Sequence, residues 1–207
     1  MSSSNGYKNL ARNILPSGPE IVGGYGVSVY DRSGNRYFDL CSQTLNLNLG
    51  HRHPVIMEVL KELINNKDFI YFQSSMWRNS SMADLAEKLV EITPGDLTKV
   101  NLKLCNGGDA NEDAFKRTRK FHMAEQRKRI VAQYRSHHGE SSETLSASGK
   151  HFPKEAYLSG SGNFLHISPV YSFRRPFDVS EEDYAIECAR SFESLVKNRG
   201  DIGGIVM

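Results

Sequence analysis

The chain of 207 residues is long enough for one large domain, or for a small domain and part of a larger one. Hydrophobic residues make up 39% and charged residues 24%, a composition that is typical of globular proteins and excludes a disordered or fibrous chain. The formal net charge of +2 gives no strong electrostatic attraction to nucleic acid or to a membrane surface.

The cysteines and the N-terminal residues indicate a protein of a reducing compartment. Cys41, Cys105 and Cys188 are an odd, widely spaced set that shows neither a disulfide framework nor zinc-site spacing. Residues 1–6 lack the apolar core of a signal peptide, and no apolar run is long enough to span a bilayer. We therefore expect a soluble protein of the cytoplasm.

The first part of the chain combines a hairpin with a helix. Residues 27–30 and 36–40 are typical of two strands, and residues 31–35 between them carry turn chemistry. His53-Pro54 opens a helix, because proline is tolerated in the first turn, and an apolar stripe continues it to Asn65.

From about residue 80 the chain alternates between helices and strands. The expected helices are at residues 81–92, 110–122 and 181–197, the first with Ser81 and Asp84 as a capping box. The expected strands are at residues 100–104, 130–132 and 202–207, with a long polar loop after the second. This order favours an α/β domain with a largely parallel sheet.

The sharpest chemical feature is a glycine pair, Gly107 and Gly108, between an expected strand and an expected helix. Glycines at a helix N-terminus let backbone N–H groups approach an anion, and the helix dipole adds favourable potential, so a phosphate fits there. The alternative is an ordinary strand-to-helix turn with Asp109 as the N-cap. The loop matches neither the Walker pattern nor the dinucleotide fingerprint, so a nucleotide is not favoured.

A second polar loop, Ser136-His137-His138-Gly139, follows the next expected strand. Ligands in open α/β sheets lie beyond the carboxyl ends of the strands, so this loop and the glycine loop are expected to line one site. The alternative is a surface loop whose histidines have no special role. We do not expect a metal, because no carboxylate or cysteine lies at convincing ligand spacing.

Other histidines and motifs give weaker signals. His51 and His53 are typical of turn and capping residues rather than of ligands. The sequence contains no Gly-x-Ser-x-Gly elbow, no HExxH and no CxxC.

Taken together, four motifs resemble the class III pyridoxal-phosphate-dependent aminotransferase family. They are VYDRSGNRYFD at 29–39, LGHRHP at 49–54, CNGGDANE at 105–112, and HHG at 137–139 followed by LSASG at 145–149. Their order and spacing are similar to the family's from about Leu15 to Met207, which is far more specific than any single motif.

The resemblance implies a fold type I architecture, which is an α/β fold with a mostly parallel sheet and helices on both faces. The sheet is expected to be incomplete in this chain. Residues 1–75 would form the N-terminal part of the small domain. Residues 76–207 would begin the large domain that binds pyridoxal 5'-phosphate.

The resemblance also implies roles for the residues of the two loops. Gly107 and Gly108 match the backbone that holds the cofactor phosphate. Asn106 stands where the family has serine, so a hydroxyl contact to the phosphate is expected to be lost. No metal ligand is implied.

Three further residues match positions near the cofactor. His137 matches the aromatic residue that stacks on the pyridine ring, and we expect a neutral imidazole there because a protonated pyridine repels a cation. Gly139 matches the glycine that brings its loop close to the cofactor. Glu112 matches an acid in the helix after the phosphate loop, for which we expect a supporting role.

In the family, the aspartate that pairs with the pyridine nitrogen and the lysine that holds the cofactor as a Schiff base come later than Met207. The resemblance therefore implies no catalytic residue within this chain. We expect a piece of a larger protein: a truncated gene product, a proteolytic fragment, or a subunit completed by a complementary C-terminal chain.

The expected function is the N-terminal portion of an enzyme that moves an amino group between an amine or amino acid and a 2-oxo acid. The family also includes decarboxylases, racemases and aminomutases. The alternative is an inactive protein that binds pyridoxal phosphate or a complementary chain. A homo-oligomer is expected because family members are typically homodimers, and the sequence does not identify the substrate.

Overall fold

The computed structural model describes residues 18–68, 76–102, 106–149 and 162–207. The chain divides into two compact units, one ending at Arg78 and one from Asn79 to Met207. The expected domain boundary after residue 75 falls at the edge of a segment outside the described residues, and it stays a prediction.

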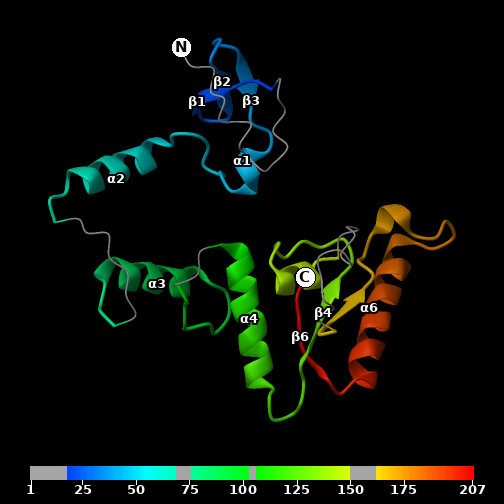
Figure 1. Ribbon diagram of the computed structural model, residues 1–207. Coiled ribbons are helices and arrows are strands. Elements are labelled where there is room, and N and C mark those ends of the chain that lie inside the picture. Colours follow the sequence, from blue (N-terminus) through cyan, green and yellow to red (C-terminus); the bar gives the residue numbers. More distant parts are fainter. Residues whose placement is uncertain (1–17, 69–75, 103–105, 150–161) are drawn as a thin grey trace. The chain divides into compact units, whose positions relative to one another are not determined.

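In its described residues, the first unit holds a small antiparallel sheet and two helices (Figure 1). Its strands are β1 (Ile21–Tyr25), β2 (Ser28–Asp31) and β3 (Arg36–Phe38), in the order β1-β2-β3. Its helices are α1 (Ser42–Leu45) and α2 (Pro54–Asn65). The expected hairpin and the helix that begins at Pro54 are confirmed.

The Asp31 carboxylate organises the turn between β2 and β3. It accepts hydrogen bonds from the Asn35 side chain at 2.9 Å, from the Ser33 N–H at 2.9 Å and from the Tyr37 hydroxyl at 2.8 Å. These donors, the Asn35 side chain first, hold the pKa of Asp31 below its ordinary value because they stabilise the charged form. The turn chemistry of residues 31–35 thereby fixes the hairpin.

The LGHRHP motif joins this sheet to α2. The backbones of Gly26 and His51 exchange two hydrogen bonds of 2.9 and 2.8 Å, and His51 Nε2 lies 2.8 Å from Asp39 Oδ2. Gly50 has a φ of +81°, and a Cβ there would lie 2.8 Å from the Gly26 carbonyl oxygen. His53 occupies the N-cap position of α2. The predicted turn role is confirmed for His51, whereas the side chain of His53 makes no capping hydrogen bond although the residue occupies the N-cap position.

The second unit is built on a parallel sheet in the order β5-β4-β6. The strands are β4 (Arg129–Gln133), β5 (Phe164–Ile167) and β6 (Ile202–Ile205). The helices are α3 (Ser80–Ile92), α4 (Gly107–Phe121), α5 (Ser142–Ala147), the 3-10 helix η3 (Ser172–Arg174) and α6 (Glu181–Asn198). In Figure 1, β4 and β6 lie between α4 and α6. The expected α/β class is confirmed.

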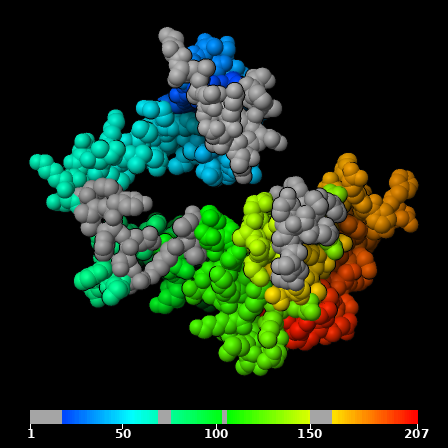
Figure 2. Space-filling model, viewed as in Figure 1, coloured from blue at the N-terminus to red at the C-terminus, as the bar shows by residue number. Residues whose placement is uncertain are grey.

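The core of this unit lies between α4 and the sheet. Phe115 of α4, Ile130 of β4 and Ala147 of α5 form one buried cluster, and Phe164 packs against it. The rings of Phe115 and Phe164 meet edge to face, with centroids 5.2 Å apart. In Figure 2, the green segment of α4 lies against the yellow-green segment that carries α5, in agreement with their packing contact.

Three expectations for the second unit are corrected. Helix α3 begins at Ser80, because Asn79 is its N-cap and accepts a hydrogen bond from the Met82 N–H at 3.2 Å, so Ser81 and Asp84 are not its capping box. Residues 100–102 form no strand, and residues 103 and 104 lie outside the described residues. A strand requires a neighbour that pairs with its backbone groups, and none pairs with residues 100–102 in the described part. The expected polar loop contains α5 and β5.

Candidate functional site

Helix α4 begins at the glycine pair because Asn106 caps it. Asn106 has an extended backbone, its Oδ1 accepts a hydrogen bond from the Asp109 N–H at 3.0 Å, and its Nδ2 donates to the Asp109 carboxylate at 3.2 Å. The helix therefore starts at Gly107 rather than at Ala110. The alternative with Asp109 as the N-cap is wrong, since Asp109 lies in the first turn.

The cap leaves two donors of the first turn available. The N–H groups of Gly107 and Gly108 have no hydrogen-bond partner in the described part of the chain. A Cβ added to Gly107 would meet no atom of the described residues within 4 Å, so the space around it is open with respect to them. N–H groups at the positive end of a helix, here one of 15 residues, are the kind of donor that anion sites in proteins use.

The two loops predicted to share a site lie side by side. A Cβ on Gly139 would lie 3.0 Å from the Cα of Gly108 and 2.5 Å from Thr144 Oγ1, and Gly139 has a φ of +136°. Only glycine fits this position, because a side chain would overlap both neighbours and strain the backbone. The prediction that the loops meet is confirmed, although residues 100–102 before the glycine loop form no strand.

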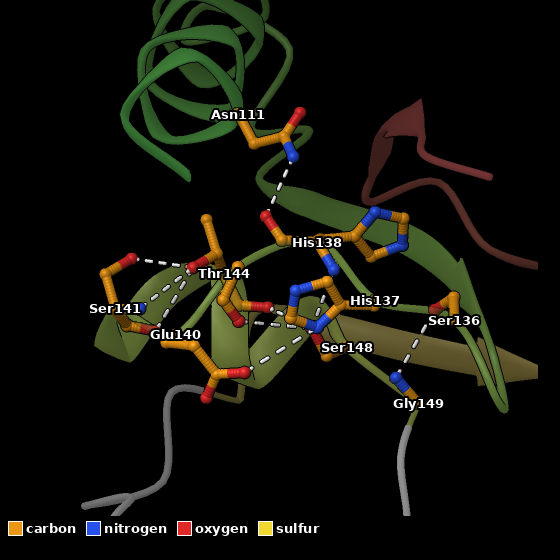
Figure 3. Close-up of polar contacts among 10 residues, drawn as sticks. Asn111, Ser136, His137, His138, Glu140, Ser141, Thr144, Ser148 and Gly149 are labelled. Carbon is orange, nitrogen blue, oxygen red and sulfur yellow. Dashed lines mark hydrogen bonds and ion pairs between the residues drawn. The ribbon is translucent and has the colours of Figure 1, made fainter. Parts of the chain in front are cut away.

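Side chains from two helices hold the histidine loop in place. Figure 3 shows Asn111 reaching from α4 to the carbonyl oxygen of His138, which it contacts through Nδ2 at 2.8 Å. The His138 N–H donates to Ser148 Oγ at 2.9 Å, and the Gly149 N–H donates to the Ser136 carbonyl at 3.1 Å. The Gly149–Ser136 hydrogen bond joins the two ends of the loop, and the Asn111 contact holds the loop against α4, the helix that starts at the glycine pair.

The two adjacent histidines have different environments. The side chain of His137 is 49% exposed, and its Nδ1 lies 3.8 Å from Glu140 Oε1 (Figure 3). His138 is 7% exposed and its buried Nε2 has no hydrogen-bond partner. Burial first, and then the charges of His137 and His166, lower the pKa of His138, which favours its neutral form. Only His137 is available to a ligand without rearrangement.

The predicted supporting acid lies on α4, away from the glycine pair along the helix. The Glu112 side chain is 24% exposed, and its Oε2 lies 3.7 Å from Lys116 Nζ. Its observed partner is therefore a lysine of its own helix. Within the described residues no three His, Cys, Asp or Glu side chains gather as metal ligands, and no described helix is long and apolar enough to cross a membrane.

Sequence reasoning missed three residues that shape the site: Asn111, Thr144 and Ser148. Thr144 and Ser148 are completely buried, and Thr144 belongs to a capping box with Ser141 at the start of α5. The spacing of Ser141 and Thr144, three residues apart, is the sequence pattern that could have predicted the start of α5. Nothing in the sequence pairs Asn111 with a carbonyl 27 residues away.

Comparisons with known proteins identify the family. The sequence model described as Aminotransferase class-III matches residues 15–207. A probable 4-aminobutyrate aminotransferase of Bacillus subtilis (strain 168) is 31% identical over 185 residues, which are 87% of this chain and 38% of that protein. An acetylornithine aminotransferase of Bacillus anthracis is 33% identical over 167 residues, which are 80% of this chain and 40% of that protein.

Solved structures show the same fold. The PMP-bound form of an aminotransferase from Vibrio fluvialis has a TM-score of 0.84 at 22% identity, over 99% of this chain and 48% of that chain. The omega-transferase from Vibrio fluvialis JS17 has a TM-score of 0.78 at 25% identity, over 91% of this chain and 45% of that chain. The chain thus spans two fifths to half of the proteins it matches, and it belongs to the class III aminotransferase family.

Proposed function

We propose that this chain supplies the part of an aminotransferase site that binds the phosphate of pyridoxal 5'-phosphate and stacks on its ring. The observation that carries the proposal is the pair of N–H groups at Gly107 and Gly108, which have no partner among the described residues and lie beside Gly139. A phosphate dianion at this point receives two hydrogen bonds and lies at the positive end of α4. Asn106 supports the cradle by keeping the helix start in place.

The glycine pair and the histidine loop support a phosphate at this point. A Cβ on Gly107 would meet no described atom within 4 Å, and the tight contact between Gly108 and Gly139 places the histidine loop next to the helix start. His137 is the more exposed imidazole of that loop, so it is our candidate for the stacking residue. Gly139 permits the close approach of the loop, and Glu112 stabilises α4 through Lys116.

Bound pyridoxal phosphate supplies an electron sink, and the activity we propose for the whole protein is amino-group transfer between an amine or amino acid and a 2-oxo acid. The residues of this chain contribute binding and orientation. Because the chain spans 38% of the Bacillus subtilis relative, we propose that transfer takes place when it is assembled with the remaining part of the fold. Family relationship supports a homo-oligomeric assembly.

Cofactor binding is tested by removing one N–H without disturbing the helix. Gly107→Pro deletes the donor at the first helical position, where proline is tolerated, and the extended backbone of Asn106 suits a residue before proline. The matched control, Gly107→Ala, keeps the N–H and adds a methyl group in open space. Equilibrium dialysis measures the affinity of each protein for pyridoxal phosphate and for pyridoxal.

We expect Gly107→Pro to weaken pyridoxal phosphate binding by about tenfold or more, because a hydrogen bond to a charged group contributes about 1.5–3 kcal/mol. Gly107→Ala should bind as the unaltered chain does, and pyridoxal, which lacks the phosphate, should bind weakly to all three proteins. Equal affinity for pyridoxal and pyridoxal phosphate would contradict the proposal.

A further inference from the structure

An ion pair joins the two helices that follow the loops of the candidate site. Arg119 lies about three turns along α4 from the glycine pair, and Glu143 lies in the first turn of α5, shortly after the histidine loop. Arg119 Nη2 and Glu143 Oε2 are 2.9 Å apart, and the two side chains are 21% and 29% exposed. The pair therefore links the helix that starts at the glycines to the helix that follows the histidines.

The two paired atoms depend on each other. Arg119 Nη2 and Glu143 Oε2 are both shielded from solvent, and neither makes a hydrogen bond to another group of the described residues. Removal of either charge leaves the other one buried and uncompensated, which is strongly destabilising. An exposed ion pair contributes little and constrains little. This pair, in contrast, constrains the position of α5 against α4.

Arg119 is itself held in place by two further contacts. Its Nε donates a hydrogen bond to the Lys128 carbonyl oxygen at 3.3 Å, and its guanidinium carbon lies 5.4 Å from the centre of the Phe164 ring. Phe164 packs against the buried cluster that contains Phe115, which lies one turn before Arg119 on α4. The guanidinium is thus a fixed point beside the core of the second unit.

Glu143 is adjacent to the part of α5 that contacts the histidine loop. Thr144 follows it directly and is completely buried, and its Oγ1 would lie 2.5 Å from a Cβ on Gly139. Ser148, just after the helix, accepts a hydrogen bond from the His138 N–H at 2.9 Å. A displacement of α5 would therefore displace the histidine loop relative to the glycine pair.

We propose that Arg119 and Glu143 are positioning residues of the cofactor site. Their ion pair fixes α5 against α4, and it thereby sets the separation between the histidine loop and the glycine pair. Inorganic phosphate contacts the glycine N–H groups alone, so its binding does not depend on this separation. Pyridoxal phosphate contacts both loops and does depend on it. The inference rests on the proposed function, because it concerns the same site.

The test compares Arg119→Gln with Glu143→Gln, each of which removes one charge of the pair. The control is Glu193→Gln, which breaks an exposed ion pair with Lys197 on α6. Equilibrium dialysis measures the affinities for pyridoxal phosphate and for inorganic phosphate, at a temperature at which circular dichroism shows each protein to be folded. We expect both variants to bind pyridoxal phosphate about three- to tenfold more weakly, with inorganic phosphate within about twofold and the control unchanged.

The pattern across the variants decides between positioning and other roles. Parallel losses for both ligands would overturn the inference, because they would assign the effect to the helix start or to the fold as a whole. An unchanged affinity for pyridoxal phosphate would also overturn it. An effect of Glu143→Gln alone would do so too, since it would assign Glu143 to the N-terminal charge of α5.

The double variant Arg119→Gln/Glu143→Gln tests whether the two residues act as a unit. It leaves no unpaired buried charge, so we expect it to bind pyridoxal phosphate no more weakly than the weaker single variant. Losses that multiply in the double variant would contradict a role for the pair.

Hydrogen exchange without any ligand separates this inference from the proposed function. Residues 136–139 should exchange several-fold faster in both single variants and unaltered in the control. Unchanged exchange there would overturn the inference even if the cofactor binds. Equal affinity of the unaltered chain for pyridoxal and pyridoxal phosphate would instead contradict the proposed function. If the glutamine variants do not fold, Glu143→Asp keeps the charge on a shorter side chain, and the same faster or unchanged exchange decides.

Discussion

Three glycines lie at the candidate site, and a different physical requirement favours glycine at each position. Gly107 leaves an N–H unpaired before open space, Gly108 lies against the opposite loop, and Gly139 adopts a positive φ at a point where no side chain fits. The first two were predicted from their place at an expected helix start. The reason for Gly139 depends on its contact with Gly108, which only the folded structure reveals.

Gly139→Ala should destabilise the second unit. The new Cβ would lie 2.5 Å from Thr144 Oγ1 at a φ of +136°, and we expect a loss of about 1–3 kcal/mol in the free energy of unfolding. Urea denaturation measures it, with Gly107→Ala as the matched control because its methyl group enters open space. Equal stability of the two variants would argue against the close contact of the loops.

Asp109 should weaken anion binding, because its carboxylate lies in the first turn of α4. Asp109→Asn removes that charge and keeps a side chain that can contact Asn106. We expect the affinity for inorganic phosphate to rise by about two- to fivefold at low salt. Asp113→Asn, one turn further along, is the control, since the Asp113 charge is already paired with Arg117. An unchanged or lower affinity in Asp109→Asn would place the anion elsewhere.

At the scale of elements, the site depends on fastening the histidine loop to α4. Asn111 contacts the loop from the helix side and Ser148 from the end of α5. Each contact joins two residues that are far apart in the sequence, His138 with Asn111 of α4 and His138 with Ser148 after α5. For this reason neither contact follows from local sequence patterns.

Asn111→Ala should loosen this fastening. The carbonyl of His138 loses its donor, and we expect a loss of about 1 kcal/mol of stability with faster hydrogen exchange in residues 136–139. The control is Asn198→Ala, whose side chain bonds Ser194 on an exposed face of α6. Exchange that is unaltered in the loop would show that Asn111 does not restrain it.

The sequence predicted most of the long helices and four of the strands, and it missed short or glycine-containing elements. Helices α2 and α6 follow from apolar spacing, and strand β4 from a short apolar run, near the observed bounds. β1 was missed because its sequence, IVGGY, contains two glycines, and α5 because it has six residues. Residues 100–102 alternate correctly, yet form no strand, because alternation alone does not provide a hydrogen-bonded neighbour.

On the scale of the whole molecule, an ion cluster joins the starts of the neighbouring strands β4 and β6. The Asp201 carboxylate accepts hydrogen bonds from Arg199 at 2.9 Å and from Arg129 at 2.8 Å. Arg199 first, and then Arg129, lower the pKa of Asp201 to about 2, against the opposing effect of desolvation. The charged cluster therefore survives into moderately acidic solution.

The pH dependence of stability should report this cluster. A carboxyl whose pKa is lowered on folding stabilises the folded state above its ordinary pKa of 3.8, and the contribution is lost as the pH falls through about 2. Thermal unfolding between pH 5 and pH 2 should therefore show a smaller decline for Asp201→Asn than for the unaltered chain. Parallel declines would mean that Asp201 is not paired in solution.

The fold class and the family were accessible from the sequence because four motifs occur together in order. The register of the small sheet was not accessible in the same way, since it depends on which residues of β1, β2 and β3 pair. A sequence pattern gives alternation, whereas the register decides which side chains share a face.

The central claim is that the Gly107 and Gly108 N–H groups bind the cofactor phosphate. Titration of the ¹⁵N-labelled chain with pyridoxal phosphate, followed by amide NMR, tests it most directly. We predict that the largest amide shifts occur at Gly107 and Gly108, that inorganic phosphate reproduces them, and that pyridoxal does not. Saturable shifts centred on other residues, with these two amides unmoved, would contradict the account.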